Sequence, residues 1–306
     1  MKIIVFGASG FIGKRVFEAL SAVHEVYSGD RTSNGEEKSL VVDLLDRDSV
    51  VELLEKVRPE VIINCAGSVE NSEKALSINP IITLNIIQAI VLTKLPVKKV
   101  ITSGSAGEYG IVASEGSVSE ETPLMGTTFY ARSKVLESSV ALALSEAYGV
   151  PLVVARIFNP IGIGMHPRFL LPNLIKQVGE VKTGQRKSIE LSRLDAKRDY
   201  INVLDIAAAI KLLVENDCPN RVYNIGSGNP ISNKQLVEGI FSELGVSMKG
   251  LSLIETSDSP EPNFAVHANI SKMIGDFGWK PKYSISETIK QVADSLTTQE
   301  TLNDAK

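Results

Sequence analysis

Cysteine and histidine, which supply many metal ligands in proteins, are scarce in this chain. Its 306 residues include two cysteines, Cys65 and Cys218, and three histidines, His24, His166 and His267. The cysteines are far apart in the sequence and the histidines are scattered, so neither set has the spacing of a metal site. Two such cysteines do not form a disulfide framework either. We therefore expect no metal, and a reducing, cytoplasmic location.

The chain also lacks an excess of positive charge and long apolar runs. Its formal net charge is −4, so no overall positive field attracts nucleic acid. We find no run of about 18 apolar residues. Only five apolar residues precede the first glycine in MKIIVFG, too few for the apolar core of a signal peptide. We expect neither a nucleic-acid nor a membrane partner.

Short β-branched runs alternate with longer helical patterns along the first half of the chain. The helical patterns cover residues 11–22, 46–57, 73–94 and 128–148. The strand-like runs are KIIVF, EVYS, SLVVDL, EVIINCAG, KKVITSGS and PLVVARIF. This alternation predicts an α/β, Rossmann-like fold, in which helices cover both faces of a doubly wound parallel sheet.

The pattern changes beyond the sixth predicted strand. HPRFLLPNLIKQV and NVLDIAAAIKLLVEN are typical of helices, and RDYINV is typical of an extended segment. We expect a dinucleotide-binding domain of residues 1–159 and 198–226. A smaller, discontinuous substrate lobe would then comprise residues 160–197 and 227–306.

Three glycines, Gly7, Gly10 and Gly13, are spaced three residues apart where the first strand gives way to the first helix. In a dinucleotide-binding loop, the first glycine permits the tight turn and the second lets the backbone approach the pyrophosphate. The third allows the helix to pack closely on the sheet. The helix N-terminus then offers free N–H groups to the phosphates. Turn glycines without a ligand are the alternative, but the strand before and the helix after favour dinucleotide binding.

Asp30 follows Gly13 by seventeen positions, at the end of the second predicted strand. A carboxylate there can accept hydrogen bonds from the adenosine ribose and disfavours a 2′-phosphate, which favours NAD. The adjacent Arg31 could pair with a 2′-phosphate, so NADP stays open. Asp43, in VVDLLD, could reach the adenine; a helix N-cap or turn aspartate is the alternative.

Tyr130 and Lys134 are four residues apart in FYARSK, on one face of a predicted helix. A lysine ammonium stabilises a nearby phenolate and can hold ribose hydroxyls. Ser105, in SGSAGEYG, ends the fifth predicted strand, at the edge where open parallel sheets bind ligands. Its hydroxyl can donate to a substrate oxygen while Tyr130 moves the proton. A chance Tyr–Lys pair and a turn serine are the alternatives for each signal alone.

These motifs together resemble those of the extended short-chain dehydrogenase/reductases, which modify nucleotide-activated sugars. The resemblance covers nearly the whole chain, through GASGFIG, NCAG, SGSAGEYG, YARSK, RIFNPIG, RDYINVLDIAAA, YNIGSG and FGWKPKYSISE. It implies that Ser105, Tyr130 and Lys134 are the catalytic residues, and that Asn79 supports the active site.

The resemblance also implies the ligand contacts. The substrate would meet Ser105, Asn159 and Arg198, with Arg198 on the diphosphate; a salt bridge from Arg198 to Asp199 or Asp195 is the alternative. The dinucleotide, NAD with NADP open, would contact Gly7, Gly10, Phe11, Ile12, Gly13, Asp30, Arg31, Asp43, Leu44, Cys65, Ala66, Gly67, Tyr130, Lys134 and Ile157.

Among the family's reactions, we expect reduction of a GDP- or dTDP-linked 4-keto-6-deoxyhexose, with a nucleotide-sugar 4-epimerase as the alternative. Dehydration is disfavoured, because Gly107 stands where 4,6-dehydratases carry a glutamate, and Glu108 would face another way. Ser259 and Asn269 replace an arginine and an aspartate of the family pattern, which leaves the nucleotide open. A non-catalytic dinucleotide sensor is the remaining alternative, although a sensor needs no aligned proton-transfer residues.

The family also implies a homodimer. Its interface would be formed by the helices at residues 73–94 and 128–148. The segment ITLNIIQAIVL within the first of these is equally consistent with a helix buried against the sheet.

Overall fold

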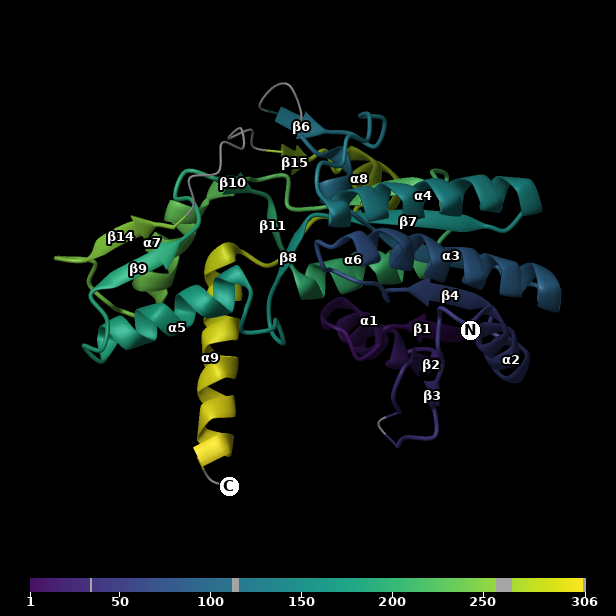
Figure 1. The fold of residues 1–306 in the computed structure, drawn as a ribbon, viewed down its shortest axis with the longest axis horizontal. Coiled ribbons are helices and arrows are strands. Elements are labelled where there is room, and N and C mark those ends of the chain that lie inside the picture. Colours follow the sequence, from purple (N-terminus) through teal and green to yellow (C-terminus); the bar gives the residue numbers. More distant parts are fainter. Residues whose placement is uncertain (34, 112–115, 257–265, 305–306) are drawn as a thin grey trace.

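Seven parallel strands form the central sheet of the chain (Figure 1), which we describe from a computed structural model. The structure describes residues 1–33, 35–111, 116–256 and 266–304, with side chains through residue 296. The strands are β1 Lys2–Phe6, β2 Glu25–Asp30, β3 Ser39–Val41, β4 Val61–Asn64, β5 Lys99–Ser105, β7 Leu152–Ile157 and β12 Val222–Ile225. Their order is β12-β7-β5-β4-β1-β2-β3, with every neighbouring pair parallel. The predicted Rossmann-like α/β fold is therefore confirmed.

Helices cover both faces of this sheet because its strands are apolar on both sides. They are α1 Phe11–Ser21, α2 Arg47–Val57, α3 Glu73–Thr93, α4 Phe129–Tyr148 and α6 Val203–Glu215. Along β1, Ile3 and Val5 pack with α1 and α6, whereas Ile4 and Phe6 pack with α2, α3 and α4. The first four predicted helices agree with α1, α2, α3 and α4 to within one residue at each end.

Side-chain caps explain where three of these helices begin. Asp46, Ser72 and Thr128 each accept a hydrogen bond from a backbone N–H in the first turn of α2, α3 and α4 respectively. Such caps satisfy donors that have no partner inside the helix. The cap at Thr128 matters for the site, because it fixes the start of the helix that carries Tyr130 and Lys134.

Among the described residues, α3 is the one helix long and apolar enough to cross a membrane by length and composition. Half of its apolar window is buried inside the molecule, where it packs against α2 and α4. A core helix of a soluble protein passes the same test. Its inward residues, such as Ile82, Ile86 and Ile87, belong to the core beneath the sheet.

A smaller part of the chain packs at one end of the sheet (Figure 1). Its core joins Leu174, Ile189, Leu236, Ile240 and Ile289. Its main elements are α5 Leu170–Lys182, β9 Ser188–Leu191, α7 Asn233–Glu243, β14 Ser252–Glu255 and α9 Ile285–Asp304.

Short strand pairs and two short helices complete the described fold. The pairs are β8 Asn159–Ile161 with β11 Tyr200–Asn202, β10 Lys197–Arg198 with β13 Ile231–Ser232, and β6 Gly116–Val118 with β15 Val266–Ala268. The helices are η1 Ala106–Tyr109 and α8 Ser271–Phe277. Met273 and Trp279, in the segment predicted for the lobe, join the core of α1 and α6. The exact domain division stays a prediction.

Candidate active site

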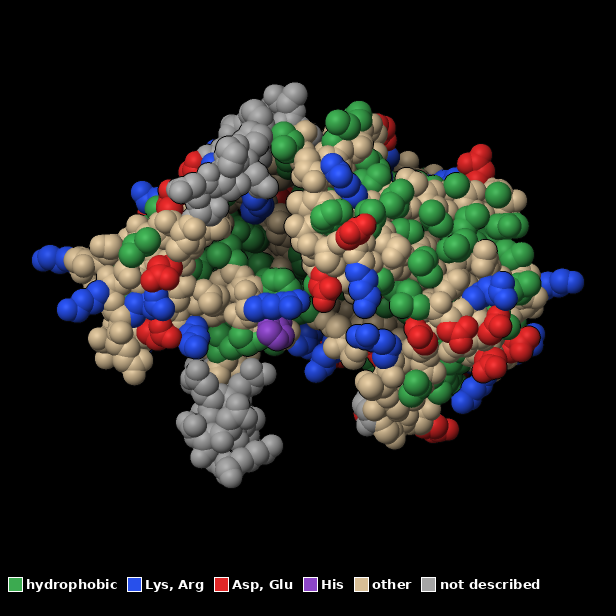
Figure 2. Space-filling view, viewed as in Figure 1, with side chains coloured by type: hydrophobic (Ala, Val, Ile, Leu, Met, Phe, Trp, Pro, Cys, Tyr) green, Lys and Arg blue, Asp and Glu red, His purple; other side chains and the backbone are tan. Residues whose placement is uncertain are grey.

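The predicted site residues gather where the parallel strands end. Gly7 follows β1, Asp30 ends β2, Ala66 follows β4, Ser105 ends β5 and Ile157 ends β7. The carboxyl ends of parallel strands meet at one edge of a sheet, where open α/β folds bind ligands. This edge points toward the smaller part (Figure 1), and the surface is hollowed between the two (Figure 2).

The glycine loop has the geometry of a phosphate cradle. A Cβ at Gly7, where φ is +74°, would lie 2.7 Å from the nitrogen of Ala66, and a Cβ at Gly13 would lie 2.0 Å from the oxygen of Gly7. Only glycine fits at either position. Gly10 begins α1 without a side-chain cap, so the N-terminal N–H groups of the helix can meet an anion. Phe11 and Ile12 form that first turn. These residues fit a dinucleotide pyrophosphate.

Asp30 fixes the same loop from the end of β2. Its Oδ1 accepts hydrogen bonds from the backbone nitrogen of Ser9 at 3.1 Å and from its hydroxyl at 2.7 Å. The adjacent Arg31 is exposed. Asp43 is also exposed, and its carboxylate accepts the backbone N–H of Leu45 at 2.9 Å. The turn contact expected for Asp43 under the alternative is thus present, and its role toward adenine stays a prediction.

The loop after β4 is held in place by Asn79 of α3. The amide oxygen of Asn79 accepts the backbone N–H of Ser68 at 2.7 Å, and its nitrogen donates to the hydroxyl of Ser133 at 2.9 Å. A Cβ at Gly67 would lie 2.8 Å from that amide oxygen. Burial raises the pKa of the Cys65 thiol to about 11. The hydrogen bonds of Asn79 support its role as a positioning residue. The raised pKa of Cys65 keeps its thiol uncharged. Leu44, three residues beyond the end of β3, is buried.

Ser105, Tyr130 and Lys134 come from elements that pack against one another. Helix α4 contacts both β5 and η1. The Ser105 hydroxyl accepts the backbone N–H of Gly107 at 3.1 Å, which leaves its own hydrogen free to donate to a ligand. Tyr130 is half-buried in the first turn of α4. Lys134 is one turn further along, and its Nζ donates to the carbonyl of Ser103 at 2.5 Å.

A buried glutamate that the sequence analysis did not single out contacts this lysine. Oε2 of Glu137 lies 2.5 Å from Nζ of Lys134. Burial is the largest influence and lowers the pKa of Lys134, but the adjacent Glu137 carboxylate and its hydrogen bond, together with weaker electrostatic contributions, raise the pKa overall. The i, i+3 spacing of the two residues on a predicted helix is the sequence signal that could have identified the pair.

Glu108 is turned away from the open edge, as predicted. It is fully buried. One carboxylate oxygen accepts the backbone N–H of Ser105 at 2.7 Å, and the other accepts from the Ser138 hydroxyl at 2.9 Å and from Nε of Arg156 at 3.0 Å. Its contacts hold the serine in place and leave no free acid at this position.

The predicted substrate contacts lie on the strands that lead into the smaller part. Asn159 donates to the backbone carbonyl of Asp199 at 3.0 Å. Arg198 is exposed and donates to a neighbouring backbone carbonyl. Arg198 forms a salt bridge with neither Asp195 nor Asp199. The Asp195 carboxylate pairs with Arg193 instead. The buried Asp199 carboxylate accepts from Ser227, Gly228 and Ala268.

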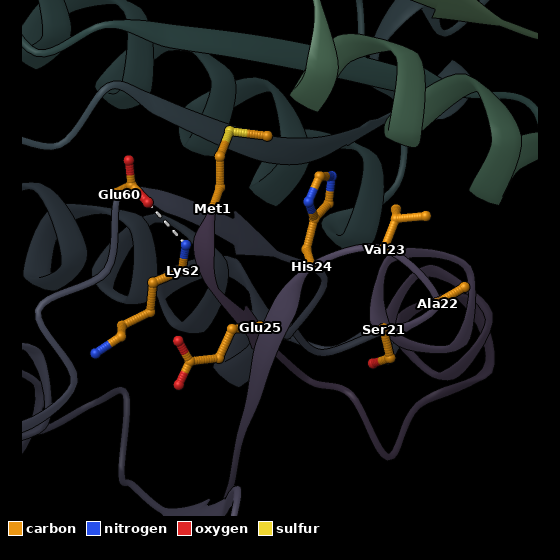
Figure 3. A pocket seen from close by; sticks show the side chains of 8 residues that line it. All are labelled: Met1, Lys2, Ser21, Ala22, Val23, His24, Glu25 and Glu60. Carbon is orange, nitrogen blue, oxygen red and sulfur yellow. Dashed lines mark hydrogen bonds between the residues drawn. The ribbon is translucent and has the colours of Figure 1, made fainter.

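The described ranges contain no cluster of three or more His, Cys, Asp or Glu residues suited to a metal. Ser259 lies outside the described residues, and Asn269 caps a turn by accepting the backbone N–H of Ser271. A pocket at the amino ends of β1 and β2 (Figure 3) contains no predicted site residue; it is lined by Met1, Lys2, Ser21, Ala22, Val23, His24, Glu25 and Glu60.

The glycine cradle at β1 and the Ser–Tyr–Lys set beside β5 define the class of a Rossmann-fold, dinucleotide-dependent oxidoreductase of the extended short-chain type. Residues 3–226 match the model of the NAD dependent epimerase/dehydratase family. The chain therefore belongs to that family and is an NAD(P)-dependent enzyme, as its motifs predict.

The relatives of this chain include a nucleotide-sugar reductase and a nucleotide-sugar epimerase. The chain is 27% identical to GDP-6-deoxy-D-mannose reductase of Pseudomonas aeruginosa, over 95% of each chain. It is 28% identical to UDP-glucose 4-epimerase of Pisum sativum, over 94% of this chain and 93% of the relative. A solved structure of RMD from Pseudomonas aeruginosa complexed with NADPH has 25% identity and a TM-score of 0.83, and covers 98% of this chain and 100% of that chain.

Proposed function

We propose that this enzyme reduces a 4-keto-6-deoxyhexose carried on GDP or dTDP, with NAD(H) or NADP(H) as the cofactor. The observation that carries the proposal is that Lys134 of α4 donates to the Ser103 carbonyl of β5, the strand that Ser105 ends, at the sheet edge where the glycine loop follows β1. Similarity to a GDP-6-deoxy-D-mannose reductase over nearly the whole chain supports the sugar class.

Each residue of the set has a separate task. The Ser105 hydroxyl donates to the sugar oxygen and orients it. Tyr130 delivers the proton to that oxygen as it becomes a hydroxyl. The Lys134 ammonium stabilises the phenolate that Tyr130 leaves behind, and it holds the ribose of the dinucleotide. The chemistry that the dinucleotide supplies when bound is hydride transfer at carbon 4.

The substrate's anionic half is recognised by the strands at the junction with the smaller part. Arg198 is exposed there and makes no salt bridge to Asp195 or Asp199, so its guanidinium can pair with a diphosphate in a bidentate contact. The Asn159 amide donates to the backbone carbonyl of Asp199, the residue next to Arg198. Asp30 favours NAD over NADP, because its carboxylate repels a 2′-phosphate.

A 4-epimerase is the second candidate, because the similarity to UDP-glucose 4-epimerase is equally extensive and the same three residues serve both reactions. Dehydration is not favoured: Gly107 provides no acid, and the Glu108 carboxylate is already bonded to Arg156 and Ser138. A non-catalytic dinucleotide sensor is the least favoured function, because a sensor needs no serine, tyrosine and lysine for proton transfer.

We further propose a cytoplasmic homodimer formed through α3 and α4. Apolar side chains gather over these helices (Figure 2). Ile81 and Leu92 of α3 are exposed by 37% and 56%, and Phe129 and Leu136 of α4 by 43% and 45%. Burying such a surface against a second copy is favourable. Sedimentation of the wild type beside Leu92→Glu tests this: a wild-type monomer would contradict it.

The reaction is tested with the purified protein and a panel of UDP-, GDP- and dTDP-sugars, with and without NADH and NADPH. Stoichiometric oxidation of added NADH or NADPH by a 4-keto sugar supports the reductase. Sugar interconversion by retained cofactor, with no external NADH, would mean an epimerase. No reaction with any nucleotide sugar would refute both.

A further inference from the structure

The Lys134–Glu137 pair lies in a pocket built for a carboxylate. The side chain of Glu137 is 2% exposed, and that of Lys134 is 8% exposed. While Oε2 faces the lysine, Oε1 is within reach of three neutral donors on three other elements. They are Thr83 at 3.1 Å, Thr102 at 3.2 Å and Asn64 at 3.4 Å. Burial raises the pKa of Glu137, whereas Lys134 and the Thr83 hydroxyl lower it, so these partners offset part of the burial that disfavours the ionised form.

The contacts of Lys134 determine what it can offer to a ligand. An ammonium group has three N–H donors. One donates to the Ser103 carbonyl and one to Glu137, both at 2.5 Å. One donor then remains for the dinucleotide or for Tyr130. A lysine tethered at two points loses less rotamer freedom on binding a ligand than a mobile one.

The other charged groups near Lys134 do not replace Glu137. Tyr130 acts on it from the same helix, and Glu108 acts from η1. Glu108, however, is paired with Arg156 of β7. Cys65, which follows β4, is held as a neutral thiol by burial. Glu137 is thus the one carboxylate bonded directly to Nζ within the described residues.

We propose that Glu137 is a positioning residue of the active site: it keeps Lys134 as an ammonium ion and fixes two of its donors, so that the third serves the dinucleotide. This rests on the proposed function only in that the chain must bind a nicotinamide dinucleotide. Burial is already the largest single influence on the pKa of Lys134, and without Glu137 it loses its strongest opposing charge and favours the neutral amine. An uncharged Lys134 then binds the dinucleotide less well and no longer stabilises phenolate.

The test is the affinity for NADH and NADPH, measured by fluorescence titration of the full chain between about pH 6 and pH 10. The wild type should bind with nearly constant affinity, because Lys134 stays charged. Glu137→Gln keeps the volume and removes the charge. Its affinity should fall with rising pH in one step, to at least tenfold below wild type at about pH 9.

Matched variants separate charge from packing. Thr83→Val removes a donor to the same carboxylate without changing charge, so any loss of affinity should be equal at every pH. Glu137→Gln combined with Lys134→Met should lose the step, because the titrating group is gone. Glu137→Asp keeps the charge one methylene further from Nζ and should show a smaller step in the same direction. If Glu137→Gln does not fold, the pH profile of Glu137→Asp alone tests whether the Glu137 charge keeps Lys134 charged.

The outcomes are distinct. A pH step in Glu137→Gln that disappears on removing Lys134 supports the proposal. A flat profile parallel to the wild type, in Glu137→Gln or, if that variant is unfolded, in Glu137→Asp, overturns it and leaves the proposed function intact. A wild type that binds neither NADH nor NADPH refutes the proposed function and this proposal together.

Discussion

Replacement of Gly10 by alanine should remove dinucleotide binding while sparing the fold. The backbone of Gly10 has φ −77° and ψ 170°, which alanine adopts without strain. The nearest atom to an added Cβ is the oxygen of Gly7 at 3.1 Å, a contact that a shift of a few tenths of an ångström relieves. We expect the free energy of unfolding to change by less than about 1 kcal/mol.

The effect of this substitution on the ligand is larger. The added methyl group occupies space that the pyrophosphate needs at the start of α1, and it separates the phosphates from the helix N–H groups. We expect NADH affinity to fall at least about tenfold, which corresponds to about 1.4 kcal/mol. Fluorescence titration with NADH and urea unfolding of the same preparation measure the two quantities.

Gly13→Ala is the contrasting variant. Its Cβ would lie 2.0 Å from the Gly7 oxygen and 2.7 Å from the Gly7 carbonyl carbon, so backbone must move. It should lower both NADH affinity and stability, the latter by about 1–3 kcal/mol. Gly179→Ala in α5, where nothing lies within 4 Å of the added Cβ, should change neither for the worse. Unchanged NADH binding by Gly10→Ala would refute the assignment of this loop to the pyrophosphate.

Three further predictions follow from the site. Tyr130→Phe should remove most turnover with little change in NADH affinity; undiminished turnover would refute its role as the proton donor. Arg156→Leu leaves the buried Glu108 carboxylate without its partner, so urea unfolding should report a loss of about 3–5 kcal/mol, and a loss below about 1 kcal/mol would contradict the buried pair. Asp30→Ser removes the charge that disfavours a 2′-phosphate, so affinity for NADPH relative to NADH should rise about tenfold; an unchanged ratio in paired titrations would argue against Asp30 as the ribose contact.

The sheet and its helices could be predicted because local signals coincide with tertiary structure. The apolar run KIIVF forms β1, with alternate residues in the two cores. The predicted start of the fourth helix is fixed by Thr128, a good N-cap residue. The glycine spacing predicted the loop conformation, because the positive φ of Gly7 and the close backbone contacts at Gly7 and Gly13 leave few other residues possible.

The long-range partners of buried charges could not be predicted in the same way. Glu137 is surrounded by donors from β4, α3 and β5, which are separated from it by 73, 54 and 35 positions. Glu108 pairs with Arg156 across 48 positions. Such pairings depend on which helix face packs on which strand, and periodicity alone does not specify that. For the same reason the short pair β6 and β15, distant in sequence, was not expected.

Transfer of deuterium from labelled cofactor tests the central claim most directly. NADH or NADPH carrying deuterium at the transferable position of nicotinamide is incubated with the enzyme and the 4-keto-6-deoxyhexose nucleotides of the panel, and the product is examined by NMR. The account predicts one deuterium at carbon 4 of the sugar, lost in Tyr130→Phe. Deuterium at another carbon, or none in a sugar that has nevertheless been reduced, would contradict it.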